Sequence, residues 1–243
     1  SLTFQKTDGT PIKAWAENET HLRVPREHLM PLDILHLPFE IEDESPMSFP
    51  KVKVSLTYDL RDSVQHIAKD SLLNGGNGVL SLSCGKGKTV IALHAWAGLG
   101  VPAVVIVPTK DLAYQWKSRI EEHTSVPEED IGWLSGPPSD WVWEKPICIS
   151  TIHALAAAAD DIPEHIRKHW GVAIFDEVHR LGAPYFNRAA AVCVGRRWGL
   201  SATPFRKDGM DVLYQSHIGG LLYQNLEHDS IPEVFFVSTG INI

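Results

Sequence analysis

A glycine-rich segment, Ser83-Cys84-Gly85-Lys86-Gly87-Lys88-Thr89, has the residue types that bind phosphate groups. It lies between an apolar stretch expected to be a strand and a run expected to be a helix, which is the setting of a phosphate loop. Gly85 and Gly87 let the backbone approach phosphate oxygens, and successive amides with the positive end of the helix attract anions. We expect Lys88 to reach the β- and γ-phosphates of ATP and Thr89 to hold Mg²⁺. The predicted ATP-binding residues are Cys84, Gly85, Lys86, Gly87, Lys88 and Thr89.

The segment departs from the general phosphate-loop pattern at one position. That pattern has a glycine five residues before Gly87, where this chain has Leu82. We interpret Cys84 as a small residue that fits the turn rather than as a reactive thiol. A glycine-rich turn with an incidental lysine is the alternative, and the flanking strand and helix speak against it.

Two adjacent carboxylates follow a second apolar stretch. Val172 to Phe175 run directly into Asp176-Glu177-Val178-His179. A buried strand delivers such residues to the carboxyl edge of a sheet, where ligands bind in open α/β folds. We predict that Asp176 holds Mg²⁺, that Glu177 orients and deprotonates the attacking water, and that His179 couples this site to its neighbours. A solvated strand end without function is the alternative.

The elements that position these residues alternate along the chain from Lys51 onward. We predict strands at 79–83, 103–107, 147–150, 172–175 and 198–200, and helices at 89–99, 111–123 and 153–159. Continuous apolar strands separated by helices indicate an α/β fold with a parallel sheet that is covered on both faces.

The first fifty residues differ from the rest in composition. Six prolines punctuate short apolar pieces, and residues 40–44 are acidic. Long helices are therefore not expected, and we predict a small accessory segment with short strands at residues 1–50, followed by one domain at residues 51–243. A flap that only covers the main domain is the alternative.

Composition excludes several classes of protein. The chain has 243 residues, of which 44% are hydrophobic, so disorder is excluded. We find no apolar run long enough for a membrane span and no signal segment at the start. Three widely spaced cysteines fit a reducing, intracellular setting such as the cytoplasm. The net charge of -8 excludes a simple basic DNA-binding module, although a motor can bind nucleic acid through a local groove.

A third motif, Ser201-Ala202-Thr203, completes a set that resembles the superfamily 2 helicases. The matching stretches lie in family order within residues 60–205. They are the phosphate loop, Val107-Pro108-Thr109-Lys110-Asp111-Leu112, Ser150-Thr151, Asp176-Glu177-Val178-His179 and Ser201-Ala202-Thr203. Residues 204–209 and 217–219 resemble the subgroup of xeroderma pigmentosum group B type helicases and related phage enzymes. The resemblance implies a RecA-like fold, ATP and Mg²⁺ as ligands, and DNA, single-stranded or duplex, as partner, with RNA as the less favoured alternative. A phage origin would place the protein in the host cytoplasm.

The resemblance also implies roles for residues outside the ATP site. Pro108, Thr109 and Lys110 match a segment that contacts the nucleic-acid backbone, and Thr151 matches a second backbone contact. Ser201 and Thr203 match the segment that links the ATP state to domain movement. Thr109 and Thr151 each precede a predicted helix, so helix capping is an additional or alternative role for them.

An arginine and a glutamine read adenine in relatives, often with two residues between them. Here Arg61 and Gln65 have three residues between them. We predict that Gln65 contacts adenine and that Arg61 packs on the base, with a helix-surface position as the alternative for both.

The resemblance further implies a second RecA-like domain, in cis or in trans, which contributes an arginine to the transition state. About forty residues follow Thr203, and we expect no such domain among them. Residues 231–239 resemble the strand that leads to it in relatives. We expect a piece of a longer motor, or half a motor that needs a partner, which binds Mg-ATP and hydrolyses it poorly.

Other features receive structural interpretations. We expect Trp141 and Trp143 to share a strand face and to pack under a loop, with base stacking as the alternative, also for Trp133. His165 and His169 are expected on a solvated face rather than at a metal. The pairs at 196–197 and 206–207 are expected to be surface charge, with phosphate contact as the alternative.

Three functions fit the motifs. The first is an ATP-dependent DNA helicase or translocase, and a variant of it is a duplex translocase of a restriction or remodelling complex. The second is an ATP-switched clamp on nucleic acid, against which the intact Glu177 speaks. The third is an unrelated kinase, which would leave Ser201-Ala202-Thr203 unexplained.

Overall fold

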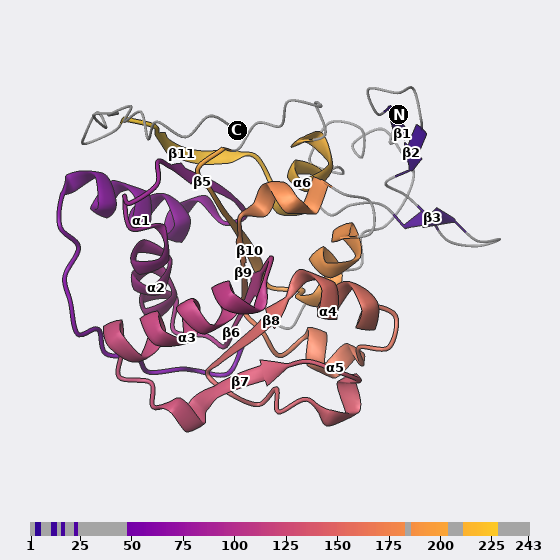
Figure 1. The fold of residues 1–243 in the computed structure, drawn as a ribbon, viewed down its shortest axis with the longest axis horizontal. Helices are drawn as coiled ribbons and strands as arrows, with labels where there is room; N and C mark the ends of the chain where they lie inside the picture. Colours follow the sequence, from indigo (N-terminus) through magenta and orange to yellow (C-terminus); the bar gives the residue numbers. More distant parts are fainter. Residues whose placement is uncertain are drawn as a thin grey trace, which may run out of the picture.

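Seven parallel strands form the central sheet of the computed structural model, in the order β11-β5-β10-β9-β6-β8-β7 (Figure 1). The structure describes residues 48–182, 186–203 and 211–227, and short strands before them. In chain order the sheet strands are β5 (Gly78–Leu82), β6 (Ala103–Val107), β7 (Ile131–Leu134), β8 (Ile147–Thr151), β9 (Val172–Asp176), β10 (Arg196–Ser201) and β11 (Leu221–Asn225). The predicted α/β fold with a parallel sheet is confirmed.

Helices cover both faces of this sheet (Figure 1). On one face lie α1 (Ser63–Gly75), α2 (Lys88–Leu99) and α3 (Lys110–His123), and on the other lie α4 (Ile152–Ala158), α5 (Glu164–Arg167) and α6 (Asp211–Ile218). Each face has its own hydrophobic core, because successive strand residues point to opposite faces. Val105 and Val107 of β6 belong to the core under α1 to α3, and Val104 and Ile106 belong to the other.

The strand register brings several motif residues to one edge of the sheet. Leu200 of β10 pairs with Asp176 of β9, and Ser201 pairs with Ser81 of β5. Further along the same edge, Val107 at the end of β6 pairs with Thr151 at the end of β8. Because all these strands are parallel, the segments that follow them emerge side by side.

Residues 51–62, which we call the strap, run along the ends of two helices before α1 begins. The Val52 amide donates to the carbonyl of Gly100 after α2, at 2.9 Å, and the Thr57 amide donates to that of His123 in α3, at 3.0 Å. Leu56 forms an isolated antiparallel bridge with Thr124. At the end of the strap, Asp62 caps α1 by accepting a hydrogen bond from the amide of Gln65.

The predicted strands and helices are found with ends shifted by one or two residues. The edge strands β7 and β11 and the helices α1, α5 and α6 were not predicted. Trp141 and Trp143 do not share a strand face, since neither lies in a strand; Trp141 is buried and its indole donates to the carbonyl of Gly136, which confirms that it packs under a loop.

The chain before residue 48 is described only as four short strands. β1 (Thr3–Gln5) pairs with β2 (Pro11–Lys13), and β3 (Ala16–Glu17) pairs with β4 (Leu22–Arg23), both antiparallel. Short strands were expected here. The predictions for residues 204–209, including Arg206 and Lys207, and for residues 231–239 lie outside the described residues, as does the choice between an accessory segment and a covering flap.

Two surface expectations were wrong. Arg197 is only 7% exposed, and its guanidinium donates to the carbonyls of Cys193 and His217, while Arg196 donates to the carbonyl of Leu73. These arginines bind carbonyl groups within the fold rather than forming surface charge. Of the two histidines expected on a solvated face, His165 is exposed as expected and His169 is not. The half-buried ring of His169 contacts Trp143, with the ring centroids 5.0 Å apart, and burial lowers the pKa of His169.

Among the described residues, no helix has both the length and the apolar character that crossing a membrane requires.

Candidate nucleotide-binding site

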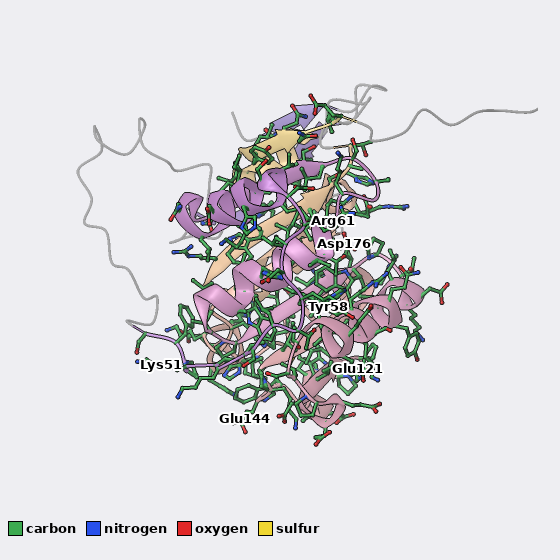
Figure 2. All side chains as sticks on the ribbon, turned by 90° about the vertical axis from the view of Figure 1, so that its left-hand side faces the viewer. Lys51, Tyr58, Arg61, Glu121, Glu144 and Asp176 are labelled. Carbon is green, nitrogen blue, oxygen red and sulfur yellow. The ribbon has the colours of Figure 1, made fainter. Side chains whose placement is uncertain are left out.

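A pocket of about 520 Å³ lies at the carboxyl ends of β5 and β9, beside the start of α2. It brings together residues from the strap, α1, the glycine-rich loop, α3 and the end of β9. Figure 2 labels three residues of its lining, Tyr58, Arg61 and Asp176, which lie in the same part of the molecule. Of the predicted ATP-site residues, the lining includes Arg61, Gln65, Gly85, Gly87, Lys88, Thr89, Asp176 and Glu177.

The glycine-rich loop has the conformation that phosphate binding requires. Gly85 and Gly87 have φ angles of +81° and +80°, which side-chain-bearing residues adopt only with strain. A methyl group on Gly87 would lie 2.6 Å from Nε2 of Gln65. Lys88 begins α2, and its ammonium donates to the carbonyl of Leu82 at 3.2 Å. A bare backbone cradle with an ammonium group at a helix start fits a nucleotide phosphate.

Gln65 and Arg61 lie against this loop. The Gln65 amide nitrogen donates to the carbonyl of Lys86 at 3.0 Å, and its oxygen accepts from the backbone amide of Arg61 at 2.8 Å. The Arg61 guanidinium donates to the carbonyl of Gly85 at 3.3 Å. Three residues, instead of the usual two, separate Arg61 from Gln65, and both side chains nevertheless line the pocket. Adenine contact by either residue stays a prediction.

Tyr58 is a lining residue that sequence reasoning missed. Its side chain is exposed, and its ring lies edge-on to His123, with centroids 5.2 Å apart. It comes from the strap, whose irregular backbone follows no sequence period. An aromatic residue shortly before the Arg61 to Gln65 segment was the available signal.

Asp176 is held by hydrogen bonds to both of its carboxylate oxygens. Oδ1 accepts from the backbone amide of Glu177 at 3.0 Å, and Oδ2 accepts from the indole nitrogen of Trp116 at 2.9 Å. Trp116 lies on α3 and is buried, and Asp176 is nearly so. The sequence placed Trp116 on the helix only as part of its apolar spacing, and no pattern indicated that its indole reaches the end of β9.

Glu177 has a strained backbone and a perturbed carboxyl group. Its φ of +49° makes it the one non-glycine residue with positive φ in the described part of the chain. Such strain costs about 1–3 kcal/mol and clusters at functional sites. Burial of the side chain, and next the nearby Asp176 carboxylate, raise the pKa of Glu177, while Lys88 and Arg180 oppose this increase.

A short series of contacts links Glu177 to the end of β10. Nδ1 of His179 lies 3.4 Å from Oε2 of Glu177 and 3.2 Å from Oγ of Ser201. The same Ser201 oxygen accepts from the backbone amide of Thr203 at 3.0 Å. Of the three residues predicted to couple the site, His179 and Thr203 therefore both contact the hydroxyl group of Ser201.

The predicted nucleic-acid contacts form a second group at the same edge of the sheet. Thr109 and Thr151 cap α3 and α4, where their hydroxyl oxygens accept from the amides of Leu112 and Ala154. Capping uses an acceptor position of each hydroxyl and leaves its O–H group able to donate. Lys110 is exposed at the first position of α3, directly after Pro108 and Thr109.

Thr89 and Asp176 are the residues that would hold Mg²⁺. Within the described residues no cluster of three or more histidines, cysteines or carboxylates forms a metal site. Mg²⁺ in nucleotide sites is held by one or two protein oxygens together with phosphates and water, and the predicted donors, Thr89 and Asp176, both line the pocket. Cys84 is exposed in the loop and the carbonyl of Lys86 accepts from Gln65, but neither residue is in the lining of the pocket, so their contact with ATP stays a prediction.

Comparison with known proteins identifies a family and several relatives. The sequence matches the family described as "Type III restriction enzyme, res subunit" over residues 54–206. It is 36% identical over 170 residues to the "DNA 3'-5' helicase XPB" of Mycobacterium tuberculosis, covering 68% of this chain and 30% of that protein. A protein of the same name from Kineococcus radiotolerans is 34% identical over 163 residues, covering 65% and 29%. The chain thus spans less than a third of the length of these relatives.

Solved structures share the fold. The UvsW helicase from bacteriophage T4 aligns with a TM-score of 0.54 and 17% identity, over 72% of this chain and 64% of that one. The Pyrococcus furiosus Hef helicase domain aligns with a TM-score of 0.51 and 20% identity, over 62% and 34%. The chain belongs to the type III restriction enzyme res-subunit family; it is similar in sequence to helicases of the XPB type, and its fold is that of a RecA-like helicase domain.

Proposed function

We propose that this chain binds Mg-ATP and couples its hydrolysis to movement along DNA, as the first motor domain of a helicase or translocase. One observation carries the proposal. Asp176 and Glu177 face the glycine-rich loop in one pocket, and His179 connects them to Ser201. A site built only to bind a nucleotide would need neither a perturbed carboxylate nor this connection.

Each residue has a definite task in this proposal. Lys88 would exchange the Leu82 carbonyl for phosphate oxygens, and Thr89 and Asp176 would hold Mg²⁺, which when bound neutralises charge on the phosphates. Glu177 would accept a proton from the attacking water at its carboxylate, and its raised pKa makes it a stronger base than an ordinary glutamate. Tyr58 offers an aromatic face for adenine beside Gln65.

DNA would lie across the ends of β6 and β8. Thr109 and Thr151 can donate their hydroxyl protons to phosphate oxygens while they cap their helices, and Lys110 adds a positive charge. The name of the Mycobacterium tuberculosis relative supports DNA as the partner. Contacts of this kind hold the backbone without reading sequence.

The same proposal divides the chain at about residue 50, with an accessory segment before it and the RecA-like domain at residues 51–243. A second RecA-like domain, in the same chain or another, would complete the ATP site with an arginine. The relatives extend well beyond the matched region, which leaves room in them for a second domain of this kind.

The test is ATP hydrolysis by this chain alone and with single-stranded DNA, duplex DNA or RNA. We expect stimulation by DNA, and we expect Glu177→Gln to lower turnover by about 100-fold or more while ATP affinity is kept, since a positioned base contributes about 10²–10⁴-fold. Lys88→Ala should weaken ATP binding at least about tenfold, because it removes a charge-assisted hydrogen bond to phosphate.

The controls separate this function from its alternatives. ATP affinity unchanged by Lys88→Ala would refute the phosphate-loop assignment. DNA binding that depends on ATP but persists without turnover, equal in wild type and Glu177→Gln, would favour a nucleotide-switched clamp. Stimulation by duplex DNA without strand separation in a two-domain protein would favour a duplex translocase.

A further inference from the structure

A second pocket, of about 570 Å³, opens at the carboxyl ends of β7 and β8, between α3 and α4. Lys110 and Thr151, two of the proposed phosphate contacts, lie in its lining, together with Tyr114, Lys117, Glu128 and Trp133. The ATP pocket has none of these residues in its lining. The position of the second pocket continues the proposed DNA path beyond the ends of the strands.

Two aromatic rings make up one wall of this pocket. Tyr114 is 62% exposed and Trp133 is 37% exposed, and their ring centroids lie 5.4 Å apart with the planes inclined by 50°. Among the phenylalanine, tyrosine and tryptophan side chains in the described part of the chain, the one other exposed ring is that of Tyr58, which lines the ATP pocket. Paired rings exposed on a concave surface indicate a binding site for a flat apolar group.

The rings are exposed because of the elements that carry them. On α3, Ala113 and Trp116 point into the core, so Tyr114 points outward, one turn after Lys110. On the edge strand β7, Ile131 and Leu134 are buried while Trp133 is not. The rings therefore stay on the surface without being needed for either core.

Charge in the pocket favours a base over a phosphate. The ammonium of Lys117 lies 2.7 Å from a carboxylate oxygen of Glu121 and 2.9 Å from one of Glu128, so its charge is neutralised. Glu128 itself would repel a phosphate. Positive charge remains at the Lys110 end, and the neutral aromatic wall lies beyond it. A DNA strand can place a phosphate at Lys110 and Thr151 and the neighbouring base against the two rings. It would then match both the positive end and the aromatic wall of the pocket.

We propose that Tyr114 and Trp133 form a stacking platform for an unpaired base of a DNA strand whose phosphates contact Thr109, Lys110 and Thr151. This inference rests on the proposed function, since it assumes that DNA crosses the ends of β6 and β8. It adds that the strand held by this domain is single-stranded at the pocket, because paired and stacked bases do not offer their faces to a side chain.

The experiment compares two single-stranded oligonucleotides of equal length, one of deoxythymidines and one with abasic sites throughout, by fluorescence anisotropy with the whole chain at fixed salt. Both carry the same phosphates, and only the first has bases. We expect the wild type to bind the first about tenfold more tightly. Tyr114→Leu with Trp133→Leu should remove this preference and leave the affinity for the abasic strand unchanged, and Tyr114→Phe should keep it.

Lys110→Ala provides the matched control, since it should weaken binding of both oligonucleotides equally. Tyr114→Leu alone, at an exposed helix position, should reduce the preference in part and cannot unfold the core. Equal binding of the two oligonucleotides by wild type, a preference that survives the double substitution, or tighter binding of a duplex of equal length would each overturn the platform. Failure to bind any of these DNAs would instead contradict the proposed function.

Discussion

Both carboxylate oxygens of Asp176 already accept a hydrogen bond from the protein, one from its neighbour's backbone and one from the Trp116 indole. Groups that hold a metal ligand in this way fix its orientation and tune its affinity. We therefore expect Trp116 to act as a positioning residue for the proposed Mg²⁺ ligand Asp176. Because Trp116 lies on α3, which is capped by Thr109 and starts at Lys110, one helix carries both the proposed DNA contact and the residue that holds Asp176.

Trp116→Phe should raise the Mg²⁺ concentration needed for half-maximal ATP hydrolysis by about tenfold or more, since loss of such a supporting group costs about 10–100-fold in metal affinity or activity. Phenylalanine keeps most of the buried apolar volume but has no N–H group. Binding of ATP without Mg²⁺ should not change. A magnesium titration of the hydrolysis rate measures the first effect, and a nucleotide titration in a chelator measures the second.

Trp96→Phe is the control for this prediction. Trp96 is also buried, and its indole donates to the carbonyl of Val101 at 2.7 Å, away from the ATP pocket. Its substitution should lower stability by about 1 kcal/mol, the usual net value of a hydrogen bond, without any shift in the magnesium requirement. An equal shift in both variants would mean that Trp116 acts only through packing.

At the scale of elements, the glycine-rich loop is held by α1 as well as by β5 and α2. Gln65 fills the space in front of Gly87 and bonds to the carbonyl of Lys86. We expect Gly87→Ala and Gly85→Ala both to weaken ATP binding, because both force a side chain into the left-handed region at a cost of about 1–2 kcal/mol. Only Gly87→Ala should also lower the preference for ATP over GTP, since only its methyl group displaces Gln65.

The measurement is the ratio of ATP to GTP affinity in each variant. Nothing lies within 4 Å of a methyl group on Gly85, so that variant isolates the backbone strain. If the ratio fell equally in both, Gln65 would not read adenine.

The strand-loop-helix order let the sequence predict the phosphate loop, the carboxylates after β9 and the strands between them, because buried parallel strands are continuous apolar runs. β7 and β11 escaped prediction since they are edge strands with partly exposed residues, such as Trp133 and Leu221, and lack that pattern. Arg197 was misjudged because burial of a charge depends on distant carbonyls, here that of His217, which no local pattern encodes. The Trp116 bond joins residues sixty positions apart and was hidden for the same reason.

At the scale of the whole molecule, α6 introduces a dependence of stability on pH. Burial, and next the nearby Arg197 guanidinium, lower the pKa of His217 to about 4. In the unfolded chain a histidine has a pKa of about 6.5, so the unfolded state takes up the proton first as pH falls. The contribution of neutral His217 to stability is therefore complete above pH 6.5 or so and is lost as pH falls toward about 4.

His217→Gln should flatten this dependence. Denaturant unfolding at a series of pH values should give a wild-type free energy of unfolding that falls more steeply, by about 1 kcal/mol per pH unit, than that of the variant across this window. His94 and His169 also have lowered pKa values and remain in both proteins, so the difference between the curves isolates His217. Parallel curves would contradict the assignment.

The strap also determines how a mechanical load would reach the ATP pocket. It is fastened at Val52 and Thr57 to the ends of α2 and α3 before the chain arrives at Arg61 and Gln65. Tension applied to the chain ahead of Lys51 would therefore reach α2 and α3 before it reached Arg61 and Gln65, the residues proposed to contact adenine. Substitutions that break these two attachments should transmit such a load to the pocket more readily than substitutions ahead of the strap.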